Sequence, residues 1–164
     1  MTTALLLGTC GANVASAASI AYTGYTVTYG EHISITAPIG AGFTAGQINL
    51  TGVTGGSLST VLAWCLDIYD DLNVKSGYGV GAPAANGIIG GLMAEGNAYL
   101  LQANPMIVTP GKTYNNKNDI SAATQVAIWS QINPTLKYSM SGTSLSQADF
   151  KSLVGWLENV PIPR

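Results

Sequence analysis

The sequence is short of charge, of histidine and of cysteine. Asp, Glu, Lys and Arg make up 9% of its 164 residues, against about 25% in an average globular protein. Six Lys and Arg residues are too few for a basic surface that neutralises phosphates, which argues against nucleic-acid binding. One histidine and two cysteines do not complete the usual ligand set of a zinc site. We therefore expect neither a metal nor a cofactor.

The composition that remains is typical of an exported protein. Glycine accounts for 20 residues, and Ser, Thr, Asn and Gln carry most of the polarity. A short apolar core, Ala4–Leu7, and a small-residue cleavage site, Ala15–Ala17, resemble the end of a secretory signal peptide. That segment is too short to cross a bilayer, so we expect no membrane span in this chain. We predict a signal-peptide remnant at 1–17, one domain at 18–160, and the start of a linker or sorting tail at 161–164.

The sequence has two cysteines, so the role of each has to be explained. Cleavage after Ala17 would remove Cys10 and leave Cys65 as the single cysteine of an exported chain, which calls for an explanation. If the N-terminal segment is instead a strand of the mature protein, a Cys10–Cys65 disulfide is the alternative in an oxidising compartment.

The first half of the chain has the pattern of strands. Apolar and polar residues alternate over Tyr25–Tyr29 and Ile33–Ala37, and Gly30–Glu31 between them predicts the turn of a β-hairpin. Two further strand-like segments are Gln47–Val53 and Leu58–Tyr69. If Leu58–Tyr69 is extended, the Cys65 side chain lies on the opposite face of the strand from Trp64 and Leu66.

The second half follows a helical period. Ile88–Gln102 predicts a first helix, in which Gly90, Gly91 and Gly96 are expected where another backbone approaches closely. A second helix has Asp119 or Ser121 as its predicted N-cap and ends before Pro134. A third helix begins at Ser146, and its predicted buried stripe is Phe150, Leu153, Val154 and Leu157. We predict a single α+β domain: an antiparallel, sheet- or barrel-like half followed by a helical half.

Gln125 is the odd member of the second helix, because it shares an apolar face with Ile128, Trp129 and Ile132. Alone, it is explained by a hydrogen bond to a neighbouring backbone, and a buried Cys65 alone is explained as a small hydrophobe.

Together, Cys65 and Gln125 allow a different chemistry. The sulfur can attack the amide carbon and expel ammonia, which leaves an internal thioester that exclusion of water preserves. Trp64 and Trp129, each next to one partner in the sequence, are candidate shields for that bond, and Asp67 is a candidate for orienting groups beside it.

Two short segments carry a resemblance to a known family. Ala63–Asp67 (AWCLD) and Thr124–Trp129 (TQVAIW) resemble the two signature motifs of bacterial surface thioester domains, which lie at the tips of Gram-positive adhesins and pili. In that family the cysteine and the glutamine of the T-Q-x-A-[IV]-W motif form a thioester, and an amine or hydroxyl on a host surface opens it and stays attached. The resemblance implies thioester roles for Cys65 and Gln125 only. The first motif departs from the family at Trp64, where Tyr, Phe or Leu is usual.

A second resemblance concerns a different group of bacteria. Exported Gram-negative proteins with a PEP-CTERM sorting tail contain similar Trp-Cys-x-Asp and Gln-x-Ala-Ile-Trp segments. Gly46–Thr51 and the small-residue composition resemble that group, and Val160–Pro163 would begin such a tail. This resemblance implies a thioester-like matrix or surface protein.

We therefore predict a protein that is secreted or lies on the cell surface of a bacterium. It forms a Cys65–Gln125 thioester and attaches covalently to an amine or hydroxyl of a surface protein or glycan, as in adhesion. Such a chain is a single-use binder and not an enzyme. One alternative is an exported structural or biofilm-matrix protein in which the two residues pack without a bond. A cysteine hydrolase with His32 as the base is a further alternative, although no protease signature surrounds Cys65.

Overall fold

The structure is a computed structural model, and it describes residues 4–7, 19–54, 60–69, 78–79, 87–141 and 144–159. Cys10 lies outside these residues, as do the cleavage site and the segment 161–164. The Cys10–Cys65 disulfide and the sorting tail therefore stay predictions.

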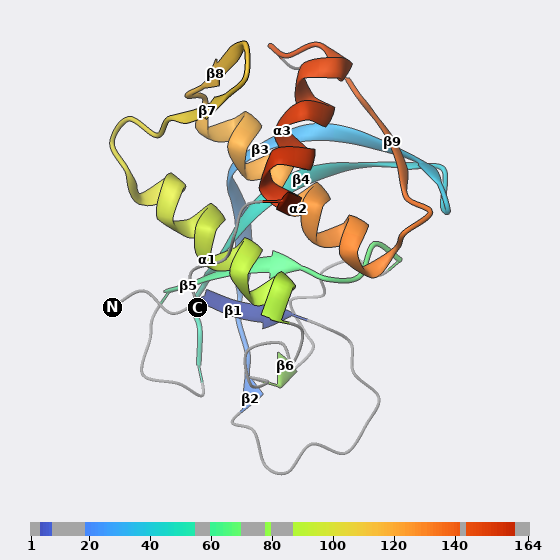
Figure 1. Ribbon diagram of the computed structural model, residues 1–164. Coiled ribbons are helices and arrows are strands. Elements are labelled where there is room, and N and C mark those ends of the chain that lie inside the picture. Colours follow the sequence, from blue (N-terminus) through green and yellow to red (C-terminus); the bar gives the residue numbers. More distant parts are fainter. Residues whose placement is uncertain are drawn as a thin grey trace.

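The strand-rich half of the chain precedes the helical half, which confirms the predicted α+β fold (Figure 1). In the described residues the main sheet has five strands in the order β1–β5–β4–β3–β9. They span Ala4–Leu7 (β1), Gly24–Ala37 (β3), Ala41–Thr51 (β4), Thr60–Cys65 (β5) and Lys137–Met140 (β9). Neighbouring strands are antiparallel except β1 and β5, which are parallel. β1 uses residues that the signal-peptide prediction assigns to the leader.

Two short strand pairs lie outside the main sheet. They are β2 (Ser19–Ile20) with β6 (Tyr78–Gly79), and β7 (Ile107–Thr109) with β8 (Lys112–Tyr114). The second pair is a hairpin that follows the first helix directly and leads into the second.

The predicted turn at Gly30–Glu31 is wrong. β3 continues through both residues, and the chain turns at 38–40 before β4 begins. Gly30 pairs with Gly46 across the β3–β4 ladder. A Cβ on Gly30 would lie 2.5 Å from a carbonyl oxygen of β4, and a Cβ on Gly46 would collide with the Tyr29 carbonyl oxygen. Glycine is needed here for the close approach of two backbones and not for a turn.

The helices follow the predicted order and are α1 (Gly87–Leu101), α2 (Lys117–Ile132) and α3 (Gln147–Asn159). The predicted N-cap of α2 is wrong. Asn116 takes that position, because its side chain accepts a hydrogen bond from the Asn118 backbone N–H at 2.9 Å. Asp119 falls in the first turn instead. Across the described ranges, no helix combines the length and the apolar character needed to span a membrane.

α3 has the predicted cap and the predicted buried stripe. The Ser146 hydroxyl oxygen accepts from the Asp149 backbone N–H at 3.1 Å, and the hydroxyl donates to the Asp149 carboxylate at 2.8 Å. The buried residues of this helix are Phe150, Leu153, Val154 and Leu157. The helical period therefore located the core face of α3 correctly.

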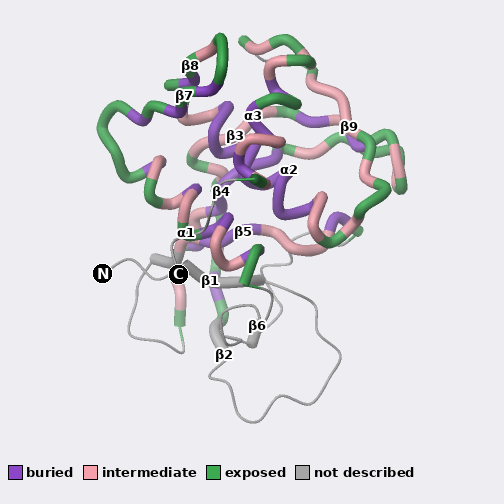
Figure 2. The backbone as a smooth tube through the Cα atoms, in the orientation of Figure 1, coloured by how far each residue is buried: buried purple, intermediate pink, exposed green. Residues whose placement is uncertain are grey.

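α2 lies at the centre of the molecule. Its residues from Asp119 to Trp129 are all buried, and in Figure 2 most of this helix is purple. It packs against β3, β4, α1 and α3. A helix with small and apolar residues on most of its surface suits a position that is covered from several sides.

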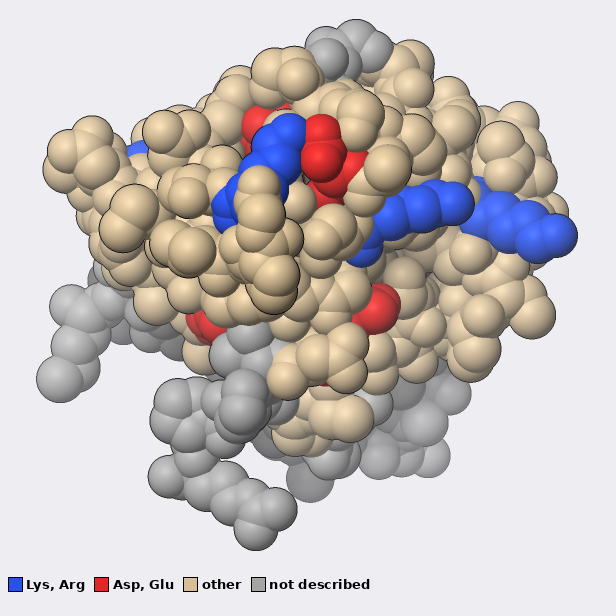
Figure 3. All heavy atoms as spheres, turned by 45° about the horizontal axis from the view of Figure 1, so that its top comes forward, with Lys and Arg blue, Asp and Glu red and all other residues tan. Residues whose placement is uncertain are grey.

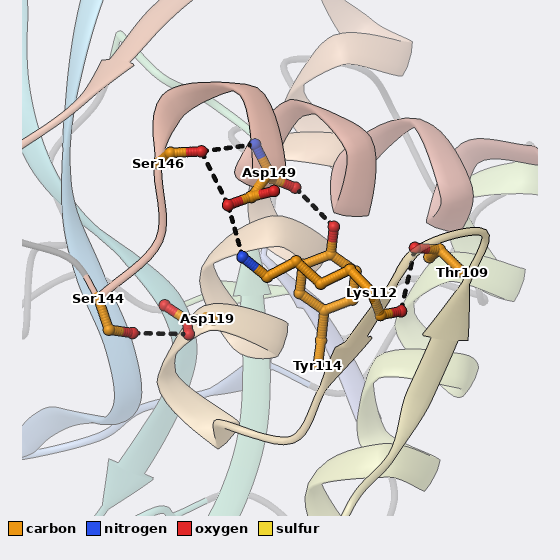
Figure 4. A network of polar contacts seen from close by, with 7 residues as sticks. All are labelled: Thr109, Lys112, Tyr114, Asp119, Ser144, Ser146 and Asp149. Atoms are coloured by element: carbon orange, nitrogen blue, oxygen red, sulfur yellow. Dashed lines mark hydrogen bonds and ion pairs between the residues drawn. The ribbon is translucent and has the colours of Figure 1, made fainter.

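Charged side chains are sparse on the face drawn in Figure 3, and one group of blue atoms lies directly against red ones. Figure 4 draws a polar network that contains an ion pair between Lys112 Nζ and Asp149 Oδ2 at 2.5 Å. The Tyr114 hydroxyl donates to the Asp149 carbonyl oxygen at 3.0 Å. Ser144 donates to the Asp119 carboxylate at 3.1 Å. The network joins the β7–β8 hairpin to α3 and the chain before α3 to the first turn of α2.

Candidate functional site

Cys65 is the last residue of β5, beyond the point where the ladder to β4 ends. The β4–β5 register runs from the Thr51–Thr60 pair to the Ile48–Ala63 pair. The Cys65 N–H donates to Gln125 Oε1 at 3.0 Å, and Gln125 Nε2 donates to the Cys65 carbonyl oxygen at 2.6 Å. The carboxamide thus bonds both backbone groups of one residue, as a neighbouring antiparallel strand would.

Gln125 is one of three polar side chains that α2 directs at the sheet. Asn118 Oδ1 accepts from a backbone N–H of β3 at 3.4 Å. Ser121 Oγ accepts from the Gln47 N–H and donates to the Tyr29 carbonyl oxygen, each at 2.8 Å. Residues three and seven positions apart share one helix face. This row bonds backbone groups of β3, β4 and β5 near the point where the β3 register shifts, beside Tyr29.

The two atoms that would react are held by the same few residues. The Gln125 amide carbon lies between the two atoms that bond the Cys65 backbone, so it is fixed beside that residue. The Cys65 sulfur is turned to the Asp67 carbonyl oxygen, to which the thiol donates at 3.0 Å. For the reaction, the sulfur would have to leave that carbonyl oxygen and reach the amide carbon.

A cavity of about 340 Å³ opens beside the thiol. Its lining includes Tyr25, Phe43, Cys65, Asp67, Ile68 and Trp129. The rings of Phe43 and Trp129 meet edge to face, with their centroids 6.2 Å apart. Among the described residues of the lining, Asp67 carries the one carboxylate. The volume is at the lower end of the range for small-molecule sites.

The structure places the predicted site residues in two groups. Cys65, Asp67 and Trp129 line the cavity, whereas Gln125, at 1% exposure on α2, is not part of the lining. Trp64 is fully buried and is not part of the lining. Its indole Nε1–H donates to Asn97 Oδ1 on α1 at 3.2 Å.

Sequence reasoning did not find Asn97. Its side-chain oxygen accepts hydrogen bonds from Trp64 Nε1 and, at 2.6 Å, from Gln47 Nε2. Gln47 is itself buried, at 3% exposure. The available signal was the neighbouring Gly96, one of the glycines predicted to sit where another backbone approaches closely. A Cβ on Gly96 would lie 2.5 Å from a Thr124 side-chain carbon, so the close neighbour is a side chain and not a backbone, and a Cβ on Gly90 would have no neighbour within 4 Å.

The carboxylates around α2 include Asp119 in its first turn and Glu158, which is hydrogen-bonded to Ser130 near the C-terminal end of the helix. Burial raises the pKa of Asp119, while the hydrogen bond from Ser144 and the charge of Lys112 oppose that shift. Asp119 Oδ1 is buried without a hydrogen-bond partner within the described part of the chain. The hydrogen bond from Lys112, followed by that from Ser146, lowers the pKa of Asp149.

Two other chemistries find little support near Cys65. His32 is exposed on β3, and its Nε2 lies 2.7 Å from where a Cβ on Gly42 would stand. It is not among the described residues that line the cavity beside Cys65. Over the residues whose positions are described, no three or more His, Cys, Asp or Glu side chains are grouped to hold a metal ion.

Comparison of the chain with protein-family models, with curated proteins and with solved structures finds no match. The resemblance to thioester domains therefore rests on the two short segments around Cys65 and Gln125.

Proposed function

We propose that this protein is a secreted or surface thioester domain of a bacterium, which links Cys65 to Gln125 and uses the bond once for covalent attachment. The observation that carries the proposal is the reciprocal pair of hydrogen bonds between the Gln125 carboxamide and the Cys65 backbone. It holds an acyl carbon beside a thiol-bearing residue that lies 60 positions away in the chain. The resemblance to surface thioester domains assigns the reaction to the same two residues.

Formation of the bond transfers an acyl group from nitrogen to sulfur. The Cys65 thiolate adds to the Gln125 amide carbon, a C–S bond forms, the C–N bond breaks, and the thiol proton leaves with the nitrogen as ammonia. Negative charge develops on Oε1 during the addition. The Cys65 N–H already donates to that oxygen, and a fixed donor at this position stabilises the intermediate.

An amine or hydroxyl of a surface protein or glycan then opens the thioester. The nucleophile becomes bonded to the Gln125 acyl carbon, and the sulfur regains a proton. The cavity is the route to the site, where Asp67 orients the nucleophile or takes its proton. The rings of Phe43 and Trp129 limit the access of water, and Trp64 supports the strand from its buried side. The acyl group is consumed, so the protein does not turn over as an enzyme.

A second candidate is an exported structural or biofilm-matrix protein in which Cys65 and Gln125 stay unlinked. The same two hydrogen bonds favour it, because they satisfy the buried amide without a covalent bond. A cysteine hydrolase is less well supported, since His32 lies outside the cavity lining.

Intact mass separates the two candidates. The thioester makes the chain lighter by one ammonia, and treatment with methylamine adds the mass of methylamine to that lighter form. Cys65→Ala and Gln125→Ala should each remove both effects. Gln131→Ala is the matched control, because Gln131 is a half-buried glutamine of the same helix. An unmodified mass for the wild-type chain, with Cys65 open to alkylation, would rule out the thioester and leave the packed, unlinked protein.

A further inference from the structure

α1 touches the residue that precedes each of the two reacting residues. A Cβ on Gly96 would lie 2.5 Å from Thr124 Cγ2 and 3.1 Å from Trp64 Cζ2. Thr124 precedes Gln125 on α2, and Trp64 precedes Cys65 on β5. Both contacted side chains are fully buried, so neither can move aside into solvent. The absence of a side chain at Gly96 therefore sets how closely α1, α2 and β5 approach.

Asn97, the next residue of α1, bonds the sheet from the same turn. Its Oδ1 accepts from Trp64 Nε1 at 3.2 Å and from Gln47 Nε2 at 2.6 Å. The Gln47 backbone N–H in turn donates to Ser121 of α2 at 2.8 Å. One oxygen of α1 thus connects β5 and β4, and β4 connects directly to the helix that carries Gln125.

We infer that Asn97 is a positioning residue for the reaction between Cys65 and Gln125, and that it acts through Trp64. Gly96 provides the close approach that lets Asn97 reach the sheet. The inference rests on the proposed function, and it names a group that controls that reaction without touching the reacting atoms.

Loss of the Asn97 oxygen should disturb the strand next to Cys65. In Asn97→Leu, the N–H groups of Trp64 and Gln47 lose their acceptor inside the protein, and the indole can regain one only by moving. Displacements of about 1 Å slow reactions by up to about 100-fold. We expect the thioester to form about tenfold more slowly or worse, so that a smaller fraction of the isolated chain carries it.

The conservative variant separates positioning from a general loss of stability. Asn97→Asp keeps an oxygen acceptor for both donors, so we expect it to retain a thioester fraction close to that of the wild type. Val154→Ala is the stability control, because Val154 is a buried residue of α3, a helix that takes no part in the hydrogen bonds of Asn97. A matched glycine pair gives a second test. Gly96→Ala should lower the thioester fraction, whereas Gly90→Ala should not, because a Cβ on Gly90 has no neighbour within 4 Å.

Intact mass of these variants, read beside their unfolding temperatures, gives distinct outcomes. Loss of the ammonia deficit in Asn97→Leu, with retention in Asn97→Asp and in Val154→Ala, supports the inference. A wild-type deficit that persists unchanged in Asn97→Leu overturns it and leaves the proposed function standing.

A wild-type chain without the deficit overturns the proposed function instead. The position of Cys65 is then read from its rate of alkylation by iodoacetamide. That rate should change about tenfold in Asn97→Leu and stay near the wild-type value in Asn97→Asp if Asn97 positions the strand. Equal rates in all three chains overturn the inference.

Discussion

Two polar regions of α2 have opposite surroundings. In the first turn, Asp119 lies in a network with Lys112 and Asp149, whose side chains are about one-third exposed (Figure 4). Further along, Gln125 is buried and makes neutral hydrogen bonds to one residue of β5. Ionisable groups exchange protons with solvent, and a sealed amide does not. Asp119 makes the stability of the first region sensitive to pH, and the covalent chemistry that we propose belongs to the second.

The largest effect should come from removing Gln125, the neutral polar side chain of this comparison. Gln125→Ala deletes the side chain that bonds Cys65 in the unlinked chain and would form the thioester in the linked one, and it leaves a cavity in α2. We expect the free energy of unfolding to fall by about 2–4 kcal/mol and the ammonia deficit to disappear. Urea unfolding and intact mass measure the two effects. Gln131→Ala should change stability by less than about 0.5 kcal/mol; an equal loss in both variants would show that the bonds to Cys65 contribute little.

Ser121→Ala tests whether the polar row of α2 acts as a unit. It removes the acceptor of the Gln47 N–H and the donor to the Tyr29 carbonyl oxygen. We expect a loss of about 1–3 kcal/mol in urea unfolding with the ammonia deficit retained, because the Gln125 bonds remain. A variant that loses the deficit as completely as Gln125→Ala does would show that Ser121 takes part in holding the carboxamide.

Asp119→Asn tests the charged region in the first turn of α2. Burial raises the pKa of Asp119 above its usual 3.8, so the folded chain binds a proton at pH values where the unfolded chain has lost it. Wild-type stability attributable to Asp119 therefore falls as the pH rises from 3.8 through the folded pKa. The variant should gain stability relative to the wild type over that window.

Urea unfolding of both chains across that pH range measures the difference. The substitution also removes the charge that, after burial, raises the pKa of Glu31, which adds to the effect in the same direction. A stability difference that does not vary with pH would contradict the assignment.

The smallest effect should come from Lys112→Ala. The ion pair to Asp149 is partly exposed, and such pairs contribute little to stability. The pKa of Asp149 is lowered, so the contribution is present above its unfolded pKa and is lost as the pH falls through the folded pKa. We expect a slight decrease in unfolding temperature near neutral pH that disappears in high salt, with the ammonia deficit unchanged. A changed deficit would mean that the two regions are coupled.

The parts of this fold that could be predicted are those set by a residue pattern within a single helix or strand. The apolar spacing of α3 located Phe150, Leu153, Val154 and Leu157 because a helix with one covered face repeats its contacts every turn. The same reasoning failed at Gly30, since a glycine in a turn and a glycine under a facing strand look alike in the sequence.

The candidate site also has residues that the sequence predicted and residues that it did not. The two short motifs pointed to Cys65 and Gln125, and the structure brings these residues together. Asn97 and Ser121 belong to no motif, because each bonds a strand that is distant in the sequence. Contacts of that kind depend on how elements pack, which no local pattern records.

The hydrogen bond to the Cys65 carbonyl oxygen bears on which kind of covalent adduct is more stable. Gln125 Nε2 donates to that oxygen at 2.6 Å, and in the reaction that we propose this nitrogen departs as ammonia. An amine that opens the thioester becomes a substituted amide, whose N–H can return to the vacated position. A hydroxyl becomes an ester, which has no hydrogen to donate, and a buried acceptor left in that state costs about 1–3 kcal/mol. The Cys65 carbonyl oxygen takes no part in the reaction, yet it would make amide-linked adducts longer-lived than ester-linked ones.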